Sequence, residues 1–452
     1  MYNKVSRIHL IGIGGIGMSA IAELLLREGY QVSGSDLKAN EIVRGLISRG
    51  VKFYQGHTRE NVLDTELVVY SSAINEQNPE MAQALSQQTP VIPRAEMLAE
   101  LMRLKYGIAV AGAHGKTTTT SMIATILMEG NLDPTIVVGG RMDNFGGTNA
   151  RLGSGEFMVV EADESDGSFN KLSPSIAVVT NMDREHMDYY KTMSRLKKAF
   201  LSFLNKVPFY GLSVICGDDP YLRVLSSKID RRKKTYGFKA HNHYRVLSYQ
   251  SNSNGTQSLI QMDHEKFELN LQVPGQHNVL NALAALIVAE ELSIPRDTAL
   301  SALSKFQGVQ RRFQKRGEKD GVLFIDDYAH HPSEIRATLR AARERFRGKK
   351  IRAVFQPHRF SRVEDLLDQF STCFKDCDSI AVTDIYAANE APVPGLESSV
   401  LVDNISQLGH PNAFYIKTPL EGVEQLIKES QPGDVILTLG AGDLPNVYKQ
   451  IF

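Results

Sequence analysis

The run Ala111–Thr120, AGAHGKTTTT, constrains this chain more than any other part of its sequence. It follows an apolar, strand-like run at 106–111 and opens a helix-like run at 118–128. A Gly-Lys-Thr turn between a strand and a helix places backbone N–H groups and the positive end of the helix dipole around anionic oxygens. We expect Lys116 to reach the outer phosphates of a nucleotide and the Thr117 hydroxyl to bind Mg²⁺.

This loop is shorter than the usual phosphate-binding pattern. That pattern has a glycine five residues before Gly115, where this chain has Val110. Spacing alone therefore leaves open an ordinary glycine-rich turn before a helix. The residues that would form the cradle are Gly112, Ala113, His114, Gly115, Lys116, Thr117 and Thr118.

Length and charge restrict the class of protein. A chain of 452 residues is too long for one core, and about three domains are expected. Its 51 basic and 51 acidic side chains cancel, which favours neither nucleic acid nor an anionic membrane as a partner. No run approaches the ~20 apolar residues of a membrane span. Three cysteines are too few for a disulfide framework, so we expect buried or idle thiols and a reducing compartment. We also expect a cytoplasmic location and a monomer or weak homodimer.

Strand-like and helix-like segments alternate almost throughout, which predicts an α/β fold with mainly parallel sheets. We expect a Rossmann-like domain at 1–105, a central ATPase-type domain with a parallel or mixed sheet at 106–311, and a second Rossmann-like domain at 312–452. The polar, alternating stretch at 244–273 predicts antiparallel strands within the central domain.

A second glycine-rich loop follows the first predicted strand, at 7–11. The loop matches the pattern G-x-G-x-x-G. In this pattern Gly12 would permit a tight turn, Gly14 would let a pyrophosphate approach the backbone, and Gly17 would allow close packing of helix against strand. Asp36, at the end of the next strand, would accept a hydrogen bond from a ribose. Alone, the pattern also fits a tight βα turn. With two phosphate loops, the chain is best explained as an enzyme that uses ATP to join a nucleotide-linked substrate to something else.

Acidic and amide side chains follow these loops. Glu161 and His186 come after strands predicted at 157–160 and 175–179, and carboxyl ends of parallel strands are where ligands bind. A carboxylate beside a phosphate cradle would hold Mg²⁺, although acids after strands also cap helices. Asn278 and Asn281 share a helix face and would contact a base or ribose, with capping or surface polarity as the alternative.

Eight runs together resemble the Mur ligase family of ATP-dependent amide ligases, over essentially the whole chain: HLIGIGGIGMSAIAELL, GAHGKTTTT, VVEADESDGSF, TNMDREHMDYY, PGQHNVLNALAA, GVQRRFQ, DDYAHHPSEI and QPHRFSR. The resemblance implies domains for a UDP-sugar, for ATP and for an amino acid, in that order. It further implies ligation of L-alanine to the lactyl carboxylate of UDP-N-acetylmuramate through an acyl phosphate. ADP and phosphate would be released, in cytoplasmic peptidoglycan precursor synthesis.

The resemblance also implies residue roles. The UDP pyrophosphate would lie on Gly12, Gly14, Gly15 and Gly17, and the uridine side would be lined by Ser35, Asp36, Ser71 and Ser72. Lys116 would bind the β- and γ-phosphates, Thr117 and Glu161 one Mg²⁺, and His186 a second. Adenine would meet His277, Asn278 and Asn281, and the nucleotide would also meet Arg312 and Asp327. The amino acid and reacting carboxylate would face Tyr328, His330, His331, Arg359 and Arg362, with His330 or His331 as the base.

Three other functions remain as alternatives. A recycling ligase of the same family would attach a preformed tripeptide to the same sugar. A nucleotide-sugar dehydrogenase would explain the first glycine loop but not the Gly-Lys-Thr loop. An ATP-binding sensor without catalysis is the third, although nothing in this sequence suggests the separate output domain that a sensor would need.

Overall fold

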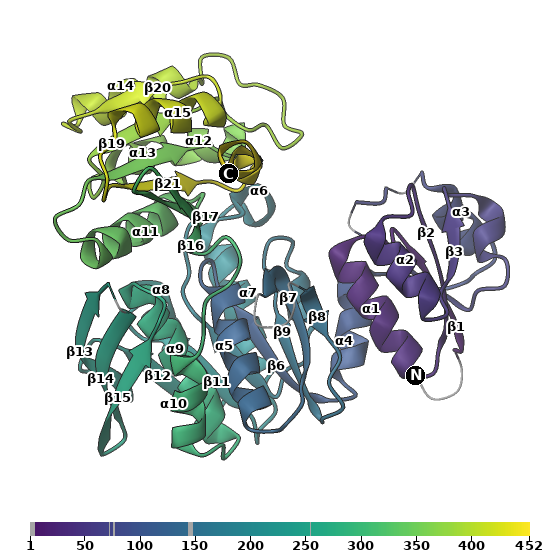
Figure 1. The fold of residues 1–452 in the computed structure, drawn as a ribbon. Coiled ribbons are helices and arrows are strands. Elements are labelled where there is room, and N and C mark those ends of the chain that lie inside the picture. The colour runs from purple at the N-terminus through teal and green to yellow at the C-terminus, as the bar shows by residue number, and fades with distance from the viewer. Residues whose placement is uncertain (1–4, 72, 76, 143–147, 254) are drawn as a thin grey trace. The chain divides into compact units, whose positions relative to one another are not determined.

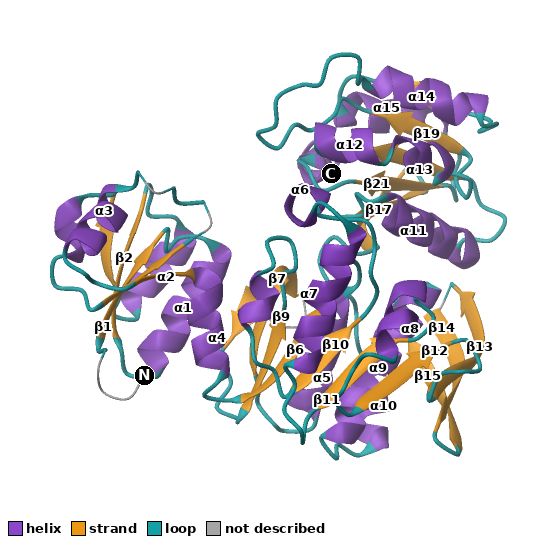
Figure 2. Ribbon diagram, turned by 180° about the vertical axis from the view of Figure 1, so that it is seen from behind, coloured by secondary structure: helices purple, strands orange, loops and turns teal. Residues whose placement is uncertain are grey.

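The computed structural model describes residues 5–71, 73–75, 77–142, 148–253 and 255–452 (Figure 1). Strands lie in separate sheets with helices packed against them, which confirms the predicted α/β class (Figure 2). The chain forms two compact units, Met1–Arg245 with Asn281–Leu303, and Val246–Leu280 with Ser304–Phe452. The domain boundaries at 105/106 and 311/312 stay predictions.

The N-terminal sheet is parallel, with strand order β3-β2-β1-β4-β5. β1 pairs with both β2 and β4, so chain order reverses there, and ligands of such sheets bind beyond the strand ends at this point. The loops after β1 and β4, which carry the two predicted UDP-binding stretches, therefore adjoin. The elements are β1 (Arg7–Ile11), α1 (Ile16–Arg27), β2 (Gln31–Asp36), α2 (Glu41–Ser48), β3 (Lys52–Gln55), η1 (Arg59–Val62), β4 (Leu67–Tyr70), α3 (Pro79–Ser86), β5 (Val91–Pro93) and α4 (Arg94–Met102).

The central sheet has the order β15-β14-β13-β12-β11-β10-β6-β9-β7-β8. β6 lies between β9 and β10 and is parallel to both, which brings the loops that follow these three strands to one edge. β14 and β15 are antiparallel, as predicted for that stretch. The elements are β6 (Tyr106–Ala111), α5 (Lys116–Glu129), β7 (Thr135–Met142), β8 (Thr148–Arg151), β9 (Phe157–Glu161), η3 (Ser168–Lys171), β10 (Ile176–Val179), α6 (Met187–Tyr190), α7 (Met193–Asn205), β11 (Leu212–Cys216), α8 (Pro220–Ser226), β12 (Lys233–Gly237), β13 (Tyr244–Asn252), β14 (Gly255–Met262), β15 (Glu265–Leu271), α9 (Gln276–Glu291) and α10 (Arg296–Ser304).

The C-terminal sheet has the order β16-β17-β21-β18-β19-β20, parallel except for β16. Side chains alternate between its faces. Ala353 and Phe355 pack in one apolar cluster with α11, while Val354 packs in another with α15. The elements are β16 (Gln314–Lys319), β17 (Val322–Asp327), α11 (Pro332–Arg345), β18 (Ile351–Phe355), α12 (Phe360–Asp365), α13 (Leu367–Thr372), β19 (Ser379–Val382), α14 (Ser398–Gln407), β20 (Ala413–Tyr415), α15 (Pro419–Glu429), β21 (Val435–Leu439), η4 (Leu444–Val447) and α16 (Tyr448–Ile451).

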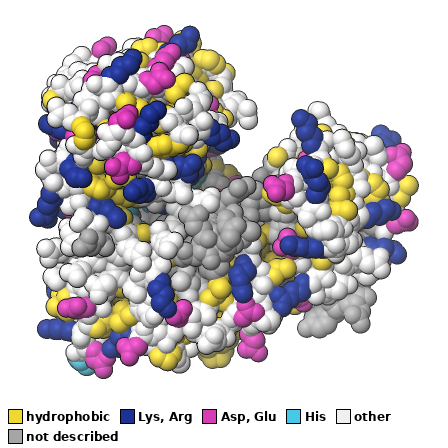
Figure 3. Space-filling model, viewed as in Figure 1, with side chains coloured by type: hydrophobic (Ala, Val, Ile, Leu, Met, Phe, Trp, Pro, Cys, Tyr) yellow, Lys and Arg dark blue, Asp and Glu magenta, His cyan; other side chains and the backbone are white. Residues whose placement is uncertain are grey.

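Surface and thiol chemistry agree with the composition. Basic and acidic side chains are interspersed on the face shown in Figure 3. Cys216, Cys373 and Cys377 are buried and form no disulfide, as expected for idle thiols. Within the described ranges, no helix combines the length and the apolar character that crossing a membrane requires.

Candidate active site

The loop between β6 and α5 needs glycine at two positions. Gly112 has φ +134° and Gly115, the N-cap of α5, has φ +80°, both in the region that side chains disfavour. A Cβ on Gly112 would lie 2.2 Å from Thr180 Oγ1, and one on Gly115 would lie 2.7 Å from Asn281 Oδ1. The loop thus packs against the residues that follow β10 on one side and against α9 on the other.

Lys116 lies at the centre of this loop. Its Nζ donates to the carbonyl oxygens of Gly112 (2.7 Å) and Ala113 (3.2 Å) and to Glu164 Oε1 (2.6 Å). Burial lowers the pKa of Lys116, but the facing carboxylates of Glu164 and Glu161 raise it above the usual value. The ammonium group is therefore charged and held in place before any phosphate arrives.

Oxygen ligands suited to Mg²⁺ gather beside Lys116. The Thr117 hydroxyl donates to Glu161 Oε2 (2.9 Å), so the two predicted ligands of one ion are neighbours. His186 Nε2 lies 3.7 Å from Glu164 Oε1, and ligand atoms of Glu164, Glu185 and His186 lie within 4.8 Å of one another. Carboxylate and hydroxyl oxygens are the donors that Mg²⁺ prefers, so Thr117, Glu161 and the carboxylates of Glu164 and Glu185 fit that ion.

Backbone contacts fix the rest of the loop. Asn181 Oδ1 accepts from the His114 N–H (2.9 Å), and the Thr180 hydroxyl donates to the His114 carbonyl (2.6 Å). The His114 ring faces Asp183, with 3.1 Å between Nε2 and Oδ2. Thr118 is buried in the first turn of α5. The predicted cradle residues thus form one loop, supported from the end of β10.

The predicted adenine contacts lie at the start of α9. Asn278 and Asn281 are both buried, and the Asn278 amide donates to the Pro274 carbonyl (2.7 Å). Burial, and then Arg312, lower the pKa of His277 to about 4, so this imidazole is neutral at pH 7. Asn281 lies against the phosphate loop through Gly115.

The first glycine loop is tied to its neighbours. Gly12 has φ +80°, and a Cβ there would lie 3.2 Å from Ser71 Cβ. Gly15 donates its N–H to the Gly12 carbonyl (3.1 Å), and the Gly14 N–H donates to Asp36 Oδ2 (2.9 Å). The Asp36 carboxylate therefore holds the backbone of the glycine loop in place, a contact that the sequence analysis did not predict. Ser72 lies outside the described residues.

Ser35 belongs to a buried polar network that sequence reasoning missed. The Ser35 hydroxyl donates to Glu80 Oε2 (2.7 Å), and this carboxylate oxygen also lies 2.9 Å from His57 Nδ1. Asn61 donates to Glu80 Oε1 (2.6 Å). Burial raises the pKa of Glu80, but hydrogen bonds from His9, Ser35 and Asn61 outweigh it and lower that pKa overall. An ionised carboxylate thus fixes the side chains at the end of β2.

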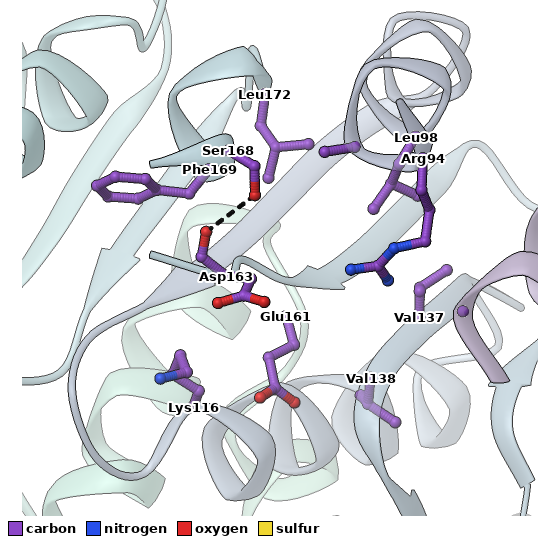
Figure 4. A pocket seen from close by; sticks show the side chains of 12 residues that line it. Arg94, Leu98, Lys116, Val137, Val138, Glu161, Asp163, Ser168, Phe169 and Leu172 are labelled. Carbon is purple, nitrogen blue, oxygen red and sulfur yellow. Dashed lines mark hydrogen bonds between the residues drawn. The ribbon is translucent and has the colours of Figure 1, made fainter. Parts of the chain in front are cut away.

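Gly17 leaves space for a side chain that the sequence analysis did not single out. The three heavy atoms closest to a Cβ placed on it all belong to Arg94 of α4, with Nη1 at 2.3 Å. The space beside Gly17 is thus filled by an arginine, and the predicted close helix–strand packing stays a prediction. Arg94 also lines a cavity of about 270 Å³, together with Lys116 and Glu161 (Figure 4). Nothing in the local sequence pattern around Arg94 marked it as a site residue.

In the C-terminal sheet, Asp327 ends β17 and organises the loop that follows. Its Oδ1 accepts from the Ala329 N–H and its Oδ2 from the Phe313 N–H, both at 2.8 Å. Burial raises the pKa of Asp327 to about 6 despite the Arg312 guanidinium. Arg312 donates to Glu334 Oε1 (3.1 Å) and lies over the Tyr328 ring at 5.3 Å. Arg312, Asp327 and Tyr328 therefore form one cluster.

The two adjacent histidines have different surroundings. His330 Nδ1 lies 3.0 Å from the Tyr328 carbonyl oxygen and 3.3 Å from Glu334 Oε2. His331 is the N-cap of α11, where its side chain accepts from the Ser333 N–H and Glu334 completes the capping box. A helix cap of this kind stabilises the helix start. His331 thus has a structural task that His330 lacks.

Arg359 and Arg362 follow β18. Arg359 has φ +69°, an uncommon conformation for a residue with a side chain, and its N–H donates to the Tyr386 carbonyl (2.9 Å). Arg362 Nη1 lies 3.2 Å from His358 Nδ1, and the His358 and His330 rings are 6.0 Å apart. Burial, and then Arg362, lower the pKa of His358 to about 4. His358, which the sequence analysis omitted, thus connects Arg362 with His330.

The structure assembles most predicted residues into local clusters. Lys116 and His186 contact Glu164, and Thr117 and Glu161 form a pair beside them. In the C-terminal sheet, Tyr328 contacts His330, and both His330 and Arg362 contact His358. Glu164 was visible as an acid in the predicted loop after β9, but position alone did not distinguish it from its acidic neighbours.

Models of known protein families match three successive parts of the chain. The Mur ligase family catalytic domain matches residues 7–106, the Mur ligase middle domain matches residues 110–289, and the Mur ligase glutamate ligase domain matches residues 311–442. Together these matches cover most of the chain and all the clusters described above.

The chain is also similar to individual proteins. It is 52% identical over 446 residues to a UDP-N-acetylmuramate–L-alanine ligase of Acidobacterium capsulatum, with 98% of this chain and 96% of the relative covered. A UDP-N-acetylmuramate–alanine ligase structure from Thermotoga maritima has a TM-score of 0.79 at 31% identity, covering 98% of this chain and 97% of that one. The fold is shared with a murein peptide ligase from Psychrobacter arcticus, at 22% identity and a TM-score of 0.68. That match covers 99% of this chain and 98% of the other.

Proposed function

The chain belongs to the Mur ligase family, and on that premise we propose that it ligates L-alanine to UDP-N-acetylmuramate, coupled to conversion of ATP to ADP and phosphate. The product is an amide on the lactyl carboxylate, formed in peptidoglycan precursor synthesis. The observation that carries the proposal is the charged, pre-ordered Lys116 beside Thr117 and Glu161, in a chain that also has a G-x-G-x-x-G loop.

The reaction needs an activated carboxylate. A lactyl carboxylate oxygen attacks the γ-phosphorus of ATP, the bond from that phosphorus to the bridging oxygen breaks, and ADP leaves. Lys116 offsets the negative charge on the β- and γ-phosphates during this transfer. Thr117 and Glu161 would hold one Mg²⁺ and His186 a second. When bound, Mg²⁺ supplies positive charge to the phosphate oxygens.

The second step makes the amide. The amine of alanine attacks the acyl carbon, and the tetrahedral intermediate collapses with loss of phosphate. His330 is our candidate for the base that takes the ammonium proton. Its Nδ1 faces a carbonyl oxygen, which only accepts, so Nδ1 carries the proton in the neutral ring and Nε2 is left as an acceptor. His331 is the less suitable base because its side chain accepts from the start of α11.

The remaining predicted contacts complete the proposal. Arg359, Arg362 and Tyr328 would bind the carboxylate of alanine and the reacting acyl group. His277, Asn278 and Asn281 would contact adenine, and Arg312 and Asp327 the nucleotide. The UDP pyrophosphate would lie on Gly12, Gly14, Gly15 and Gly17, with Ser35, Asp36, Ser71 and Ser72 on the uridine side.

We also propose a cytoplasmic location and a monomer or weak homodimer. Three buried cysteines without disulfides are typical of a reducing compartment. Light scattering over a range of protein concentrations measures the oligomeric state, and a stable tetramer or larger assembly would contradict this part.

Phosphate release tests the proposed function directly. We expect release from ATP and Mg²⁺ only when UDP-N-acetylmuramate is present, and fastest release with L-alanine among alanine, glycine, serine and the peptidoglycan tripeptide. Release with the tripeptide alone would assign the recycling reaction instead. Formation of NADH from NAD⁺ with a nucleotide sugar would indicate a dehydrogenase, and ATP binding without turnover would indicate a sensor.

A His330→Gln variant should lose turnover with alanine by ~10²-fold or more at neutral pH, because a positioned base typically contributes that much. Hydroxylamine is largely uncharged at neutral pH and needs no base. Hydroxamate formation with hydroxylamine in place of alanine should therefore continue at close to the normal rate. His264, exposed in the turn between β14 and β15, provides the control variant His264→Gln. Equal slowing of both nucleophiles would remove His330 from the role of base.

A further inference from the structure

A cavity in the first compact unit is lined from both phosphate-loop regions. Its wall includes Gly17 at the first glycine loop, Arg94 and Leu98 of α4, and Lys116 and Glu161 of the ATP site. Figure 4 shows the Arg94 guanidinium extending into the cavity from one wall, with Asp163 and Glu161 reaching into it from another. The cavity thus adjoins both the predicted diphosphate site and the predicted γ-phosphate site.

Arg94 is built into this wall by the fold. It is the first residue of α4, directly after the Pro93 N-cap, and its side chain runs along the surface left bare by Gly17. A Cβ on Gly17 would lie 2.3 Å from Arg94 Nη1 and 3.3 Å from Cδ and Cζ. The guanidinium therefore occupies the space that a side chain at position 17 would take, and a larger residue there would displace it.

The charge of Arg94 has no fixed local partner. Among the described residues, its guanidinium forms no hydrogen bond or ion pair, whereas Arg103, the C-cap of α4, pairs with Glu100. Lys116, the other cation of this cavity, is committed to Glu164 and two carbonyl oxygens. Arg94 therefore presents N–H donors that an anionic ligand entering the cavity would satisfy.

We propose that Arg94 binds the lactyl carboxylate of the sugar nucleotide and holds it for attack on the γ-phosphate. This inference rests on the proposed function. A substrate whose diphosphate lies on the first glycine loop must bring its carboxylate toward Lys116, and the cavity containing Arg94 joins these two places. The planar guanidinium matches a carboxylate with two parallel hydrogen bonds, which fixes orientation as well as distance.

The test compares two ligands that differ in the lactyl group. UDP-N-acetylmuramate carries it and UDP-N-acetylglucosamine does not. Calorimetric titration of the full chain should give the wild type ~10–100-fold tighter binding of the first, as expected for hydrogen bonds between charged groups. In Arg94→Ala this preference should fall to about equal affinity, with binding of UDP-N-acetylglucosamine nearly unchanged. Equal weakening of both ligands, or a preference kept in full, would overturn the assignment.

Controls separate this proposal from the function on which it rests. Arg103→Ala, at the C-cap of the same helix but exposed and paired, should keep the full preference. Arg94→Lys retains the charge without the paired geometry and should keep part of it, and it replaces Arg94→Ala if that variant does not fold. If the wild type releases phosphate with alanine, but Arg94→Lys and Arg94→Ala bind both sugar nucleotides as the wild type does, only the role of Arg94 is refuted. A wild type without sugar-dependent turnover refutes the proposed function and this inference together.

Discussion

Replacing Lys116 with alanine is expected to lower kcat/KM for ATP by ~10²–10³ or more, which is the usual loss for one pre-ordered stabiliser of transition-state charge. Nζ is fixed by two carbonyl oxygens and Glu164, so its position does not have to be created when ATP binds. The measurement is steady-state phosphate release with saturating UDP-N-acetylmuramate and alanine. Turnover close to that of the wild type would contradict the assignment of this loop.

Stability must be measured beside activity in this variant. Removal of Lys116 leaves Glu164 buried, and burial already raises the pKa of that carboxyl. Breaking a buried ion pair from one side costs about 3–5 kcal/mol, so the melting temperature should fall. The double variant Lys116→Ala with Glu164→Gln removes both charges and should recover stability but not activity. Lys228→Ala, at an exposed site in the same central region, is the control and should change neither.

Replacing Glu161 with alanine should also cost ~10²–10³ in turnover, and it should raise the Mg²⁺ concentration needed for half-maximal rate. Glu161 Oε2 is held by the Thr117 hydroxyl at 2.9 Å, so the carboxylate and the hydroxyl face the same space beside Lys116. Removing the carboxylate leaves one fewer anionic ligand for the ion. A Mg²⁺ titration of phosphate release, with ATP fixed, measures both effects.

Glu156→Gln gives the matched control for Glu161→Ala. Glu156 is exposed just before β9, the strand that ends in Glu161, and its change should leave the Mg²⁺ titration unaltered. A Glu161→Asp variant keeps the charge on a shorter side chain and should fall between alanine and the wild type. An unchanged Mg²⁺ requirement in Glu161→Ala would assign the ion to other residues, such as Glu164 and Glu185.

Much of the local structure followed from short stretches of sequence. The strands predicted at 7–11 and 106–111 match β1 and β6 in their bounds, because short, largely apolar runs that end at a glycine-rich turn are typical of buried parallel strands. The helix predicted at 118–128 begins earlier, at Lys116, because Gly115 supplies the left-handed N-cap. These features depend on neighbouring residues and on backbone preferences, which a sequence displays directly.

Side-chain partners were harder to predict. Glu161 and Glu164 both follow β9 in one acidic run, yet Glu164 pairs with Lys116 and Glu161 with Thr117. Similarly, His330 and His331 are adjacent, but one faces a carbonyl oxygen and the other caps α11. Composition and spacing do not separate such neighbours, because the direction of each side chain depends on a loop conformation set by the packed sheet.

The sequence by itself determined the class of fold, the two glycine-rich loops and the kind of chemistry they imply, since each depends on residues close together in the chain. Only the tertiary structure decided that Arg94 fills the space beside Gly17 and enters the cavity of Lys116 and Glu161. It also decided that Asp36 holds Gly14. These contacts arise from strand order and helix packing, which bring together residues that are distant in sequence and carry no local signal of one another.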